Sequence, residues 1–279
     1  MDKEQFSKLF DVAGMNILIT GGAGVLGSAL ARGLALGGAN VAILDLNLQN
    51  AAAVCDSLPK HKGVGKGIPV QCNVLEPESI KKAVEQSLAE MGTIDGLINA
   101  AGGNKPAAST DATHSFFDLT PDALRWVFDL NLLGTILPSQ MVGRHMAERK
   151  KGVILNITSM NAFRPLTRIP AYSAAKAGVS NFTQWLATHM AQEYSPDIRV
   201  NAIAPGFFLT EQNRFLMTEK ETGALTPRGN QVLSHTPMNR FGVPDDLVGT
   251  SLWLLSPASS FITGIVVPID GGFSGYSGV

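Results

Sequence analysis

Short runs of aliphatic and β-branched residues recur along the chain, and most are followed by a segment whose apolar residues have helical spacing. Seven runs predict strands, at residues 16–20, 40–45, 68–72, 94–100, 153–159, 198–204 and 264–270. These runs are apolar on both faces, which is typical of buried parallel strands. The alternation of strand and helix predicts an α/β fold, in which helices cover both faces of a doubly wound parallel sheet.

Two long connections interrupt this alternation, and no linker, repeat or low-complexity stretch is present, so we expect residues 1–279 to form one domain. Residues 102–119 follow the fourth predicted strand, and residues 207–243 follow the sixth. Both segments leave the carboxyl ends of strands, where sheets of this kind bind ligands. Long loops in such positions are often lids, so we expect residues 207–243 to form a substrate lid.

Composition narrows the classes of function. A hydrophobic content of 45% supports a substantial core, and a net charge of −1 offers no basic surface for nucleic acid or an anionic membrane. The N-terminus is charged and unlike a signal peptide, and no apolar run is long enough to span a bilayer. Cys55 and Cys72 form no disulfide framework, which favours a reducing cytoplasm, and the five histidines lack metal-ligand spacing.

The stretch "TGGAGVLG" (20–27) lies where a Rossmann-type phosphate loop belongs, between the first strand and the first helix. It contains Gly22-x-Gly24-x-x-Gly27, the dinucleotide-binding fingerprint. Glycines allow a tight turn and a close backbone approach, while the helix N-terminus attracts a pyrophosphate. The alternative is an ordinary glycine-rich turn.

Asp45 favours the cofactor interpretation. It ends the second strand 18 residues after Gly27, close to the expected ~20. A carboxylate there accepts the ribose hydroxyls and repels a 2′-phosphate, and residues 46–52 contain no Arg or Lys. We therefore expect NAD rather than NADP, although Asp45 taken alone could also be a helix cap.

Tyr172 and Lys176 are spaced i and i+4, which places them on one face of a helix. A nearby ammonium is expected to lower the pKa of the phenol and to fit it for proton exchange with an alcohol or ketone. Ser159 ends the preceding strand, and Asn131 lies in the predicted helical segment 121–149. The alternative for the Tyr–Lys pair is a surface cation that packs on an aromatic ring.

Taken together, these motifs, "NAAG" (99–102) and "PGFFLT" (205–210) resemble the short-chain dehydrogenase/reductase family over nearly the whole chain. The resemblance implies that Tyr172 is the acid/base, Ser159 orients the substrate, Lys176 tunes Tyr172 and holds the ribose, and Asn131 holds a proton-relay water. It also implies a homotetramer, with its main contact through residues 121–149 and 172–194.

The same resemblance implies a set of cofactor contacts along the loop edge of the sheet. Two positions depart from the family pattern: Val25 replaces a glycine, so that the loop takes another path or bends at Gly24, and Asn73 replaces an aspartate near the adenine. The implied contacts are Gly21, Gly24, Val25, Leu26, Gly27, Asp45, Leu46, Asn73, Val74, Asn99, Ala100, Ala101, Gly102, Tyr172, Lys176, Pro205, Gly206, Phe208 and Thr210.

Several longer stretches resemble a subgroup of sugar-acid dehydrogenases, the bacterial D-mannonate oxidoreductases, which interconvert D-mannonate and D-fructuronate. Cationic and hydrogen-bonding side chains suit such a polyhydroxy carboxylate, although any one arginine could instead face solvent. Other possibilities are a gluconate 5-dehydrogenase, a 3-ketoacyl reductase and a non-catalytic nucleotide sensor. The candidate substrate-binding residues are Asn104, Lys105, Asn161, Arg164, Arg168, Asn213 and Arg214.

Overall fold

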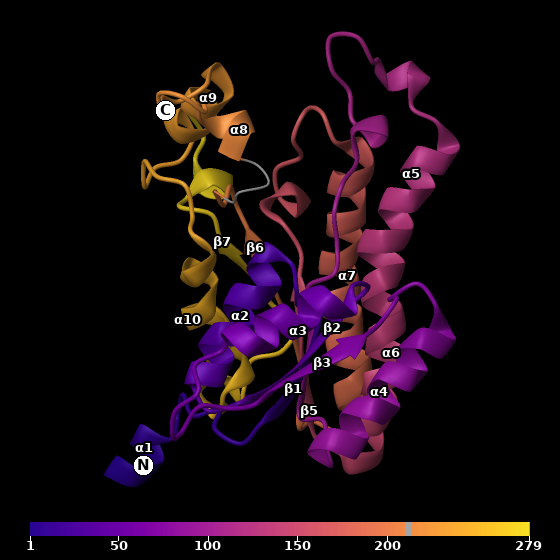
Figure 1. Ribbon diagram of the computed structural model, residues 1–279, viewed down its shortest axis with the longest axis vertical. Coiled ribbons are helices and arrows are strands. Elements are labelled where there is room, and N and C mark those ends of the chain that lie inside the picture. The colour runs from indigo at the N-terminus through magenta and orange to yellow at the C-terminus, as the bar shows by residue number, and fades with distance from the viewer. Residues whose placement is uncertain (210–213, 279) are drawn as a thin grey trace.

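The computed structural model describes residues 1–209 and 214–278, and its centre is one sheet of seven parallel strands. The strand order is β3-β2-β1-β4-β5-β6-β7, which confirms the predicted doubly wound sheet (Figure 1). All seven predicted strands are present within a few residues of their expected bounds. They are β1 (Asn16–Thr20), β2 (Asn40–Asp45), β3 (Gly67–Gln71), β4 (Gly96–Asn99), β5 (Gly152–Ile157), β6 (Ile198–Pro205) and β7 (Val266–Ile269).

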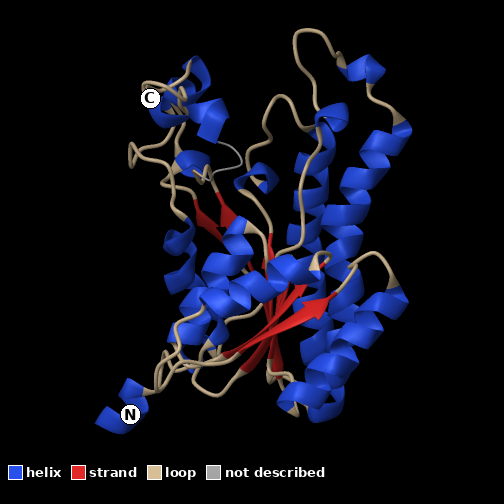
Figure 2. Cartoon of the chain, in the orientation of Figure 1, coloured by secondary structure: helices blue, strands red, loops and turns tan. Residues whose placement is uncertain are grey.

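Helices cover both faces of this sheet (Figure 2). One face packs against α2 (Val25–Leu36), α3 (Leu48–Ser57) and α10 (Val248–Leu255). The other packs against α4 (Pro77–Met91), α6 (Gly134–Arg149) and α7 (Pro170–Glu193). No helix among the residues described is both long and apolar enough to cross a membrane.

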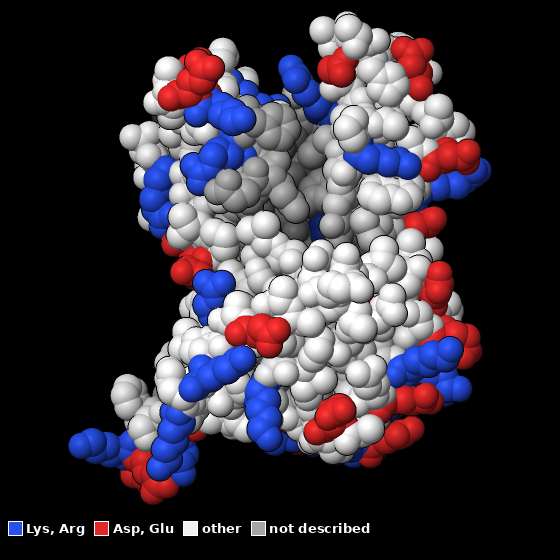
Figure 3. Space-filling model, viewed as in Figure 1, with Lys and Arg blue, Asp and Glu red and all other residues white. Residues whose placement is uncertain are grey.

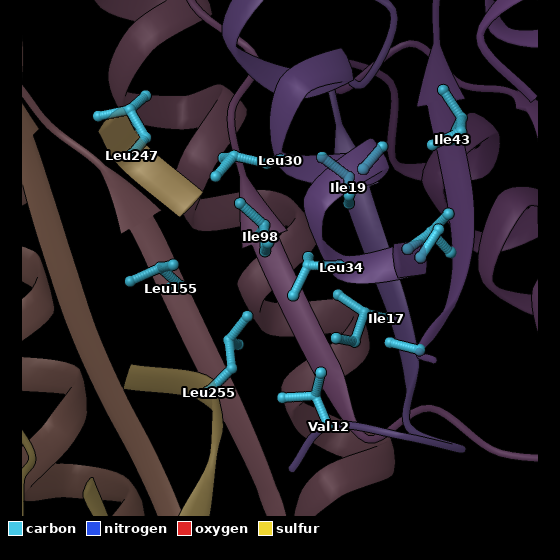
Figure 4. Packing of buried hydrophobic residues seen from close by; sticks show 14 of the residues in the cluster. Val12, Ile17, Ile19, Leu30, Leu34, Ile43, Ile98, Leu155, Leu247 and Leu255 are labelled. Atoms are coloured by element: carbon cyan, nitrogen blue, oxygen red, sulfur yellow. The ribbon is translucent and has the colours of Figure 1, made fainter. Parts of the chain in front are cut away.

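The two cores follow from the alternation of side chains along each strand. Ile17 and Ile19 of β1 face α2, where they meet Leu30 and Leu34, whereas Leu18 faces the opposite core (Figure 4). Each of these side chains is fully or almost fully buried, and each such burial contributes about 1.5–3 kcal/mol. Burial on both faces explains why the strands read as continuous apolar runs and fixes where each strand ends.

The strand order reverses between β1 and β4. From β1 the chain moves outward through β2 to β3, and it then returns to place β4 on the other side of β1. The carboxyl ends of β1 and β4 therefore diverge into helices on opposite faces, which opens a crevice. The glycine loop and the 102–119 connection both start at this crevice.

The predicted helical segment 121–149 is interrupted once. It consists of α5 (Pro121–Phe128), a π-helical turn (Asp129–Leu133) and α6. A π turn inserts an extra residue and changes the direction of the side chains around it, and such turns often occur at functional sites. Here the turn directs Asn131 inward, where it is fully buried.

The remaining elements lie beyond the carboxyl ends of the strands or at the N-terminus. The 207–243 segment contains α8 (Arg214–Met217) and α9 (Pro227–Ser234), and it lies beside the C-terminal end of the chain (Figure 1). The short helix α1 (Lys3–Ser7) lies at the opposite end of the molecule.

Candidate active site

The glycine loop is packed backbone against backbone. Gly21 has φ +60°, and a Cβ there would lie 2.7 Å from the Cα of Ala101. A Cβ on Gly27 would lie 2.5 Å from the Gly21 carbonyl oxygen. The backbone bends at Gly21 rather than at Gly24, whose φ of −71° is open to most residues. Val25 is the first residue of α2, so the departure from the family pattern does not prevent the loop from leading into that helix.

The N-terminus of α2 is suited to an anion. Gly24 is its N-cap, and it offers no side-chain hydrogen bond to the first turn. The amides of that turn are thus available to a phosphate, and the helix dipole favours negative charge at the same place. These features fit the pyrophosphate of a dinucleotide.

Asp45 lies directly beside the loop. One carboxylate oxygen accepts from the amide of Ala23 at 3.1 Å, and the other accepts from the amide of Asn47 at 3.1 Å. Each oxygen retains lone pairs for a further donor, such as a ribose hydroxyl. Leu46, the next residue, is 66% exposed and carries no charge to attract a 2′-phosphate.

Several of the residues predicted to contact the cofactor have side chains that lie in the protein interior. The Asn99 side chain is 1% exposed and donates to Ser139 at 2.9 Å and Asn156 at 2.8 Å, so a contact between Asn99 and the cofactor stays a prediction for its main chain. These bonds join β4 to β5 and α6. The side chain of Val74 packs on Gly134, and that of Phe208 is buried against Gly242, so neither faces the crevice.

The other predicted contacts lie along the crevice edge. Asn73 donates to Glu76 at 2.8 Å, which leaves its amide less available to an adenine than the sequence suggested. Pro205 ends β6, and Gly206 is held so close to Asp270 that a Cβ would lie 2.6 Å from the Asp270 Cα. Leu26 is half-buried, as are Ala100 and Ala101, while Gly102 is exposed; Thr210 lies outside the described residues.

Ser159, Tyr172 and Lys176 come together at the carboxyl end of β5. Tyr172 and Lys176 occupy successive turns of α7, with the Lys176 ammonium 5.7 Å from the centre of the Tyr172 ring. Lys176 is 4% exposed and donates to the Ile157 carbonyl at 2.8 Å, which fixes its position. Ser159 is within hydrogen-bonding distance of the Tyr172 hydroxyl.

The expected lowering of the Tyr172 pKa is wrong for this structure. Burial raises the pKa of the phenol, because the charged form is harder to solvate, and the hydrogen bond with Ser159 offsets this only in part. Burial also lowers the pKa of Lys176 from 10.5 to about 8. Desolvation by burial is thus the largest influence on the pKa of both groups.

Asn161, a predicted substrate residue, in fact positions Ser159. Its backbone and side-chain amides donate to the Ser159 hydroxyl oxygen at 3.3 and 3.1 Å. Its own carbonyl oxygen accepts from the Leu166 amide and the Ser173 hydroxyl, and the residue is 6% exposed. Because the Ser159 oxygen accepts from Asn161, its O–H remains available as a donor to the Tyr172 hydroxyl or to a ligand in the crevice.

Asn131 holds the start of the 102–119 connection. Its side chain accepts from the Gly103 amide at 3.1 Å and donates to the Gly103 carbonyl at 2.7 Å. A Cβ on Gly102 would lie 2.8 Å from the Asn131 oxygen and 3.2 Å from the Lys176 nitrogen. Asn131 and Lys176 therefore border one small space beside Gly102, which only a glycine leaves open.

The predicted substrate residues are divided among different positions. Arg164 donates to the Ser274 carbonyl at 3.0 Å, which ties the loop after β5 to the C-terminal segment. The Lys105 ammonium lies 4.8 Å from the centre of the Trp126 ring, and Asn104 donates to Ser109 at 2.8 Å. Arg214 begins α8, Arg168 is exposed, and Asn213 lies outside the described residues.

The crevice is visible as a deep hollow between the two upper lobes of the surface, and basic side chains border it (Figure 3). Arg228 of α9, which lines a small cavity together with Phe207, is not among the residues predicted from the sequence. Its neighbours in "TPRGN" give no signal that separates it from a solvated arginine.

The comparisons agree with this geometry. A family model described as short chain dehydrogenase matches residues 15–221. An uncharacterized oxidoreductase of Bacillus subtilis is 45% identical, covering 96% of this chain and 98% of the relative. A 5-keto-D-gluconate 5-reductase of Escherichia coli is 34% identical, covering 95% and 97%.

A crystal structure from Haemophilus influenzae, of a protein provisionally named D-mannonate oxidoreductase, was solved with bound NAD. It superimposes with a TM-score of 0.88 at 45% identity, covering 96% of this chain and 98% of that one. The chain belongs to the short-chain dehydrogenase family, and it is an oxidoreductase of the kind that acts on CH–OH groups.

Proposed function

We propose that the protein is an NAD(H)-dependent oxidoreductase that interconverts D-mannonate and D-fructuronate. One observation carries the catalytic part of this proposal. Ser159, Tyr172 and Lys176 are gathered at the end of β5, with the Ser159 oxygen held by Asn161 and the Lys176 nitrogen held by Ile157. A nucleotide sensor has no need of such a fixed proton-donating pair.

The residues suggest a division of labour in ketone reduction. The nicotinamide, when bound, supplies the hydride. Because its pKa is raised, Tyr172 stays protonated at neutral pH and can donate its proton to the carbonyl oxygen. Ser159, whose oxygen already accepts from Asn161, donates a second hydrogen bond to the same oxygen. Lys176 and Asn131 border the space beside Gly102, where a proton-relay water would lie.

The preference for NAD rests on Asp45. Its carboxylate lies next to the loop and accepts one amide at each oxygen, which leaves room for the two ribose hydroxyls. A 2′-phosphate at the same position would be repelled by this carboxylate, and the next residue, Leu46, is uncharged and cannot compensate. The Haemophilus structure with NAD supports this choice.

The substrate proposal is tested by NADH consumption against a panel of D-fructuronate, 5-keto-D-gluconate, D-fructose and a 3-ketoacyl ester. We expect kcat/KM to be highest for D-fructuronate and to be at least tenfold lower for neutral D-fructose. A maximum for the acyl ester would overturn the proposal. A maximum for 5-keto-D-gluconate would favour the second candidate, a gluconate 5-dehydrogenase, which the 34% identical Escherichia coli relative supports.

We also propose that residues 207–243 act as a lid over the substrate.

We further propose that the protein is a homotetramer. A row of aromatic side chains borders a groove of about 870 Å³ between α6 and α7. The row consists of Phe182, Trp185 and His189 of α7, and Tyr194 continues it. Trp185 is 56% exposed, so a second copy would bury it. Trp185→Glu should therefore lower the mass measured by light scattering, and an unchanged mass would exclude this face as the contact.

A further inference from the structure

Two arginines from segments far apart in the sequence meet at one small cavity. Arg168 precedes α7, and Arg228 lies in the first turn of α9. The cavity between them has a volume of about 190 Å³. Phe207 and Phe273 form part of its wall, with their rings 5.2 Å apart, and the polar side chains of Gln231 and His235 also line it.

This pair of arginines has no counterion among the residues that the structure describes. No carboxylate there lies within 4.0 Å of either guanidinium. The Nε of Arg228 is buried and has no hydrogen-bond partner in the described part of the chain. Burial, and then the charge of Arg168, lower the pKa of Arg228. Two like charges thus face one cavity, with a buried donor left unused.

The cavity adjoins the catalytic residues along the chain. Arg168 lies four residues before Tyr172, just ahead of the N-cap of α7, and the Ile169 carbonyl accepts from the Ser173 amide in the first turn of that helix. Phe207 directly follows Gly206 at the end of β6. The cavity is therefore built from the two segments that leave the carboxyl ends of β5 and β6, the strands nearest to the reacting groups.

We infer that Arg168 and Arg228 form the subsite for the carboxylate of a keto sugar acid, an inference that rests on the proposed function. A carboxylate removes the repulsion between the two guanidiniums and gives the buried Nε an acceptor. The planar guanidinium also matches a carboxylate in a bidentate arrangement. Arg164 is not part of this subsite, because it holds Ser274.

A surface pair without function is the competing explanation, and the burial of the Arg228 Nε argues against it. A solvated arginine keeps its donors in water, whereas the Nε of Arg228 is buried without an acceptor among the described residues. Such a group is costly unless an acceptor arrives, so the cavity is better explained as a site that an anion completes.

The subsite is tested with Arg228→Gln and Arg168→Gln, with Arg228→Lys as the variant that keeps the charge. Arg125→Gln is the control, since Arg125 is an exposed surface residue bonded to Asp122. For D-fructuronate, each Gln variant should raise KM by about 10- to 100-fold with kcat changed only a few-fold, and the affinity for NADH should stay as in the parent. Arg228→Lys should recover part of the loss, and Arg125→Gln should match the parent.

A binding measurement separates failure of this inference from failure of the proposed reaction. Calorimetry of D-mannonate with the protein–NADH complex needs no turnover, and D-mannitol serves as the uncharged probe. Weaker binding of D-mannonate by Arg228→Gln, with D-mannitol unaffected, supports the subsite even if D-fructuronate is not reduced. Equal binding of D-mannonate by parent and variant, or no binding by the parent, overturns the subsite.

Discussion

Replacing Lys176 with methionine should stabilise the ligand-free protein while it removes activity. The lysine is 4% exposed, and no carboxylate of the described residues lies within 4.0 Å of its nitrogen. Within the described part of the chain, its ammonium donates only to the Ile157 carbonyl, at 2.8 Å. A methionine of similar length fills the same space without a buried charge.

The magnitude follows from the lowered pKa. The fall from 10.5 to about 8 corresponds to a cost of about 3 kcal/mol at pH 7, at ~1.4 kcal/mol for each pH unit. Loss of the hydrogen bond to Ile157 offsets about 1 kcal/mol of this, so we expect a net stabilisation of about 2 kcal/mol. Between pH 8 and 10.5 the unfolded chain binds more protons than the folded one. The cost is therefore fully present below pH 8 and disappears above 10.5.

Urea unfolding at pH 7 and pH 9.5, at one protein concentration, measures this effect. The stability advantage of Lys176→Met should shrink by about 1–2 kcal/mol at the higher pH. Lys81→Met, on the exposed face of α4, should follow the parent at both values. An advantage that did not change with pH, or a variant clearly less stable than the parent at pH 7, would refute the reasoning.

Three further predictions concern the cofactor, the proton donor and the lid. Tyr172→Phe keeps the ring but removes the hydroxyl, so kcat should fall by about 10²–10⁴ while the Kd for NADH, measured by fluorescence, stays within a few-fold. Asp45→Ala combined with Leu46→Arg should shift the ratio of kcat/KM toward NADPH, because it replaces repulsion of a 2′-phosphate with attraction. Amide hydrogen exchange of residues 207–243 should slow when NADH and D-mannonate bind together, since substrate contacts order a lid.

Each of these three predictions would be contradicted by a specific result. A Tyr172→Phe variant that turns over within a few-fold of the parent would exclude Tyr172 as the proton donor. Equal efficiency of the parent with NADH and NADPH would remove the role given to Asp45. Exchange in 207–243 that is equally slow with and without ligands would contradict the lid, with α4 as the internal reference for global stability.

The sheet could be predicted because its determinants are local. Each strand is a short β-branched run, and burial on both faces makes the run apolar throughout. The spacing of Tyr172 and Lys176 likewise fixes their shared helix face before any tertiary contact is known. Ser159, which these rules place at the end of a strand, is the residue that the structure brings together with Tyr172 and Lys176.

What could not be predicted depends on direction and desolvation. The same asparagine side chain can reach a ligand or a neighbouring hydroxyl, and only the fold shows that Asn161 bonds to Ser159 and Asn99 to Asn156. The direction of the Tyr172 pKa shift depends on burial outweighing the hydrogen bond with Ser159, and the spacing of residues does not reveal how deeply a side chain is buried. Arg228 is a candidate site residue only because Arg168, 60 residues earlier in the sequence, lies close to it, and no local sequence pattern predicts this pairing.

The backbone packing of the glycine loop divides its positions into two groups for protein engineering. At Gly21 and Gly27 any side chain would displace a neighbouring main chain, so libraries that randomise them would yield mostly misfolded variants. Val25 already carries a side chain as the first residue of α2, and Leu46 faces solvent, whereas a Cβ on Gly24 would lie 3.2 Å from the Gly21 carbonyl oxygen. A search for altered cofactor use can therefore be restricted to Val25 and Leu46, which makes exhaustive screening of their combinations practical.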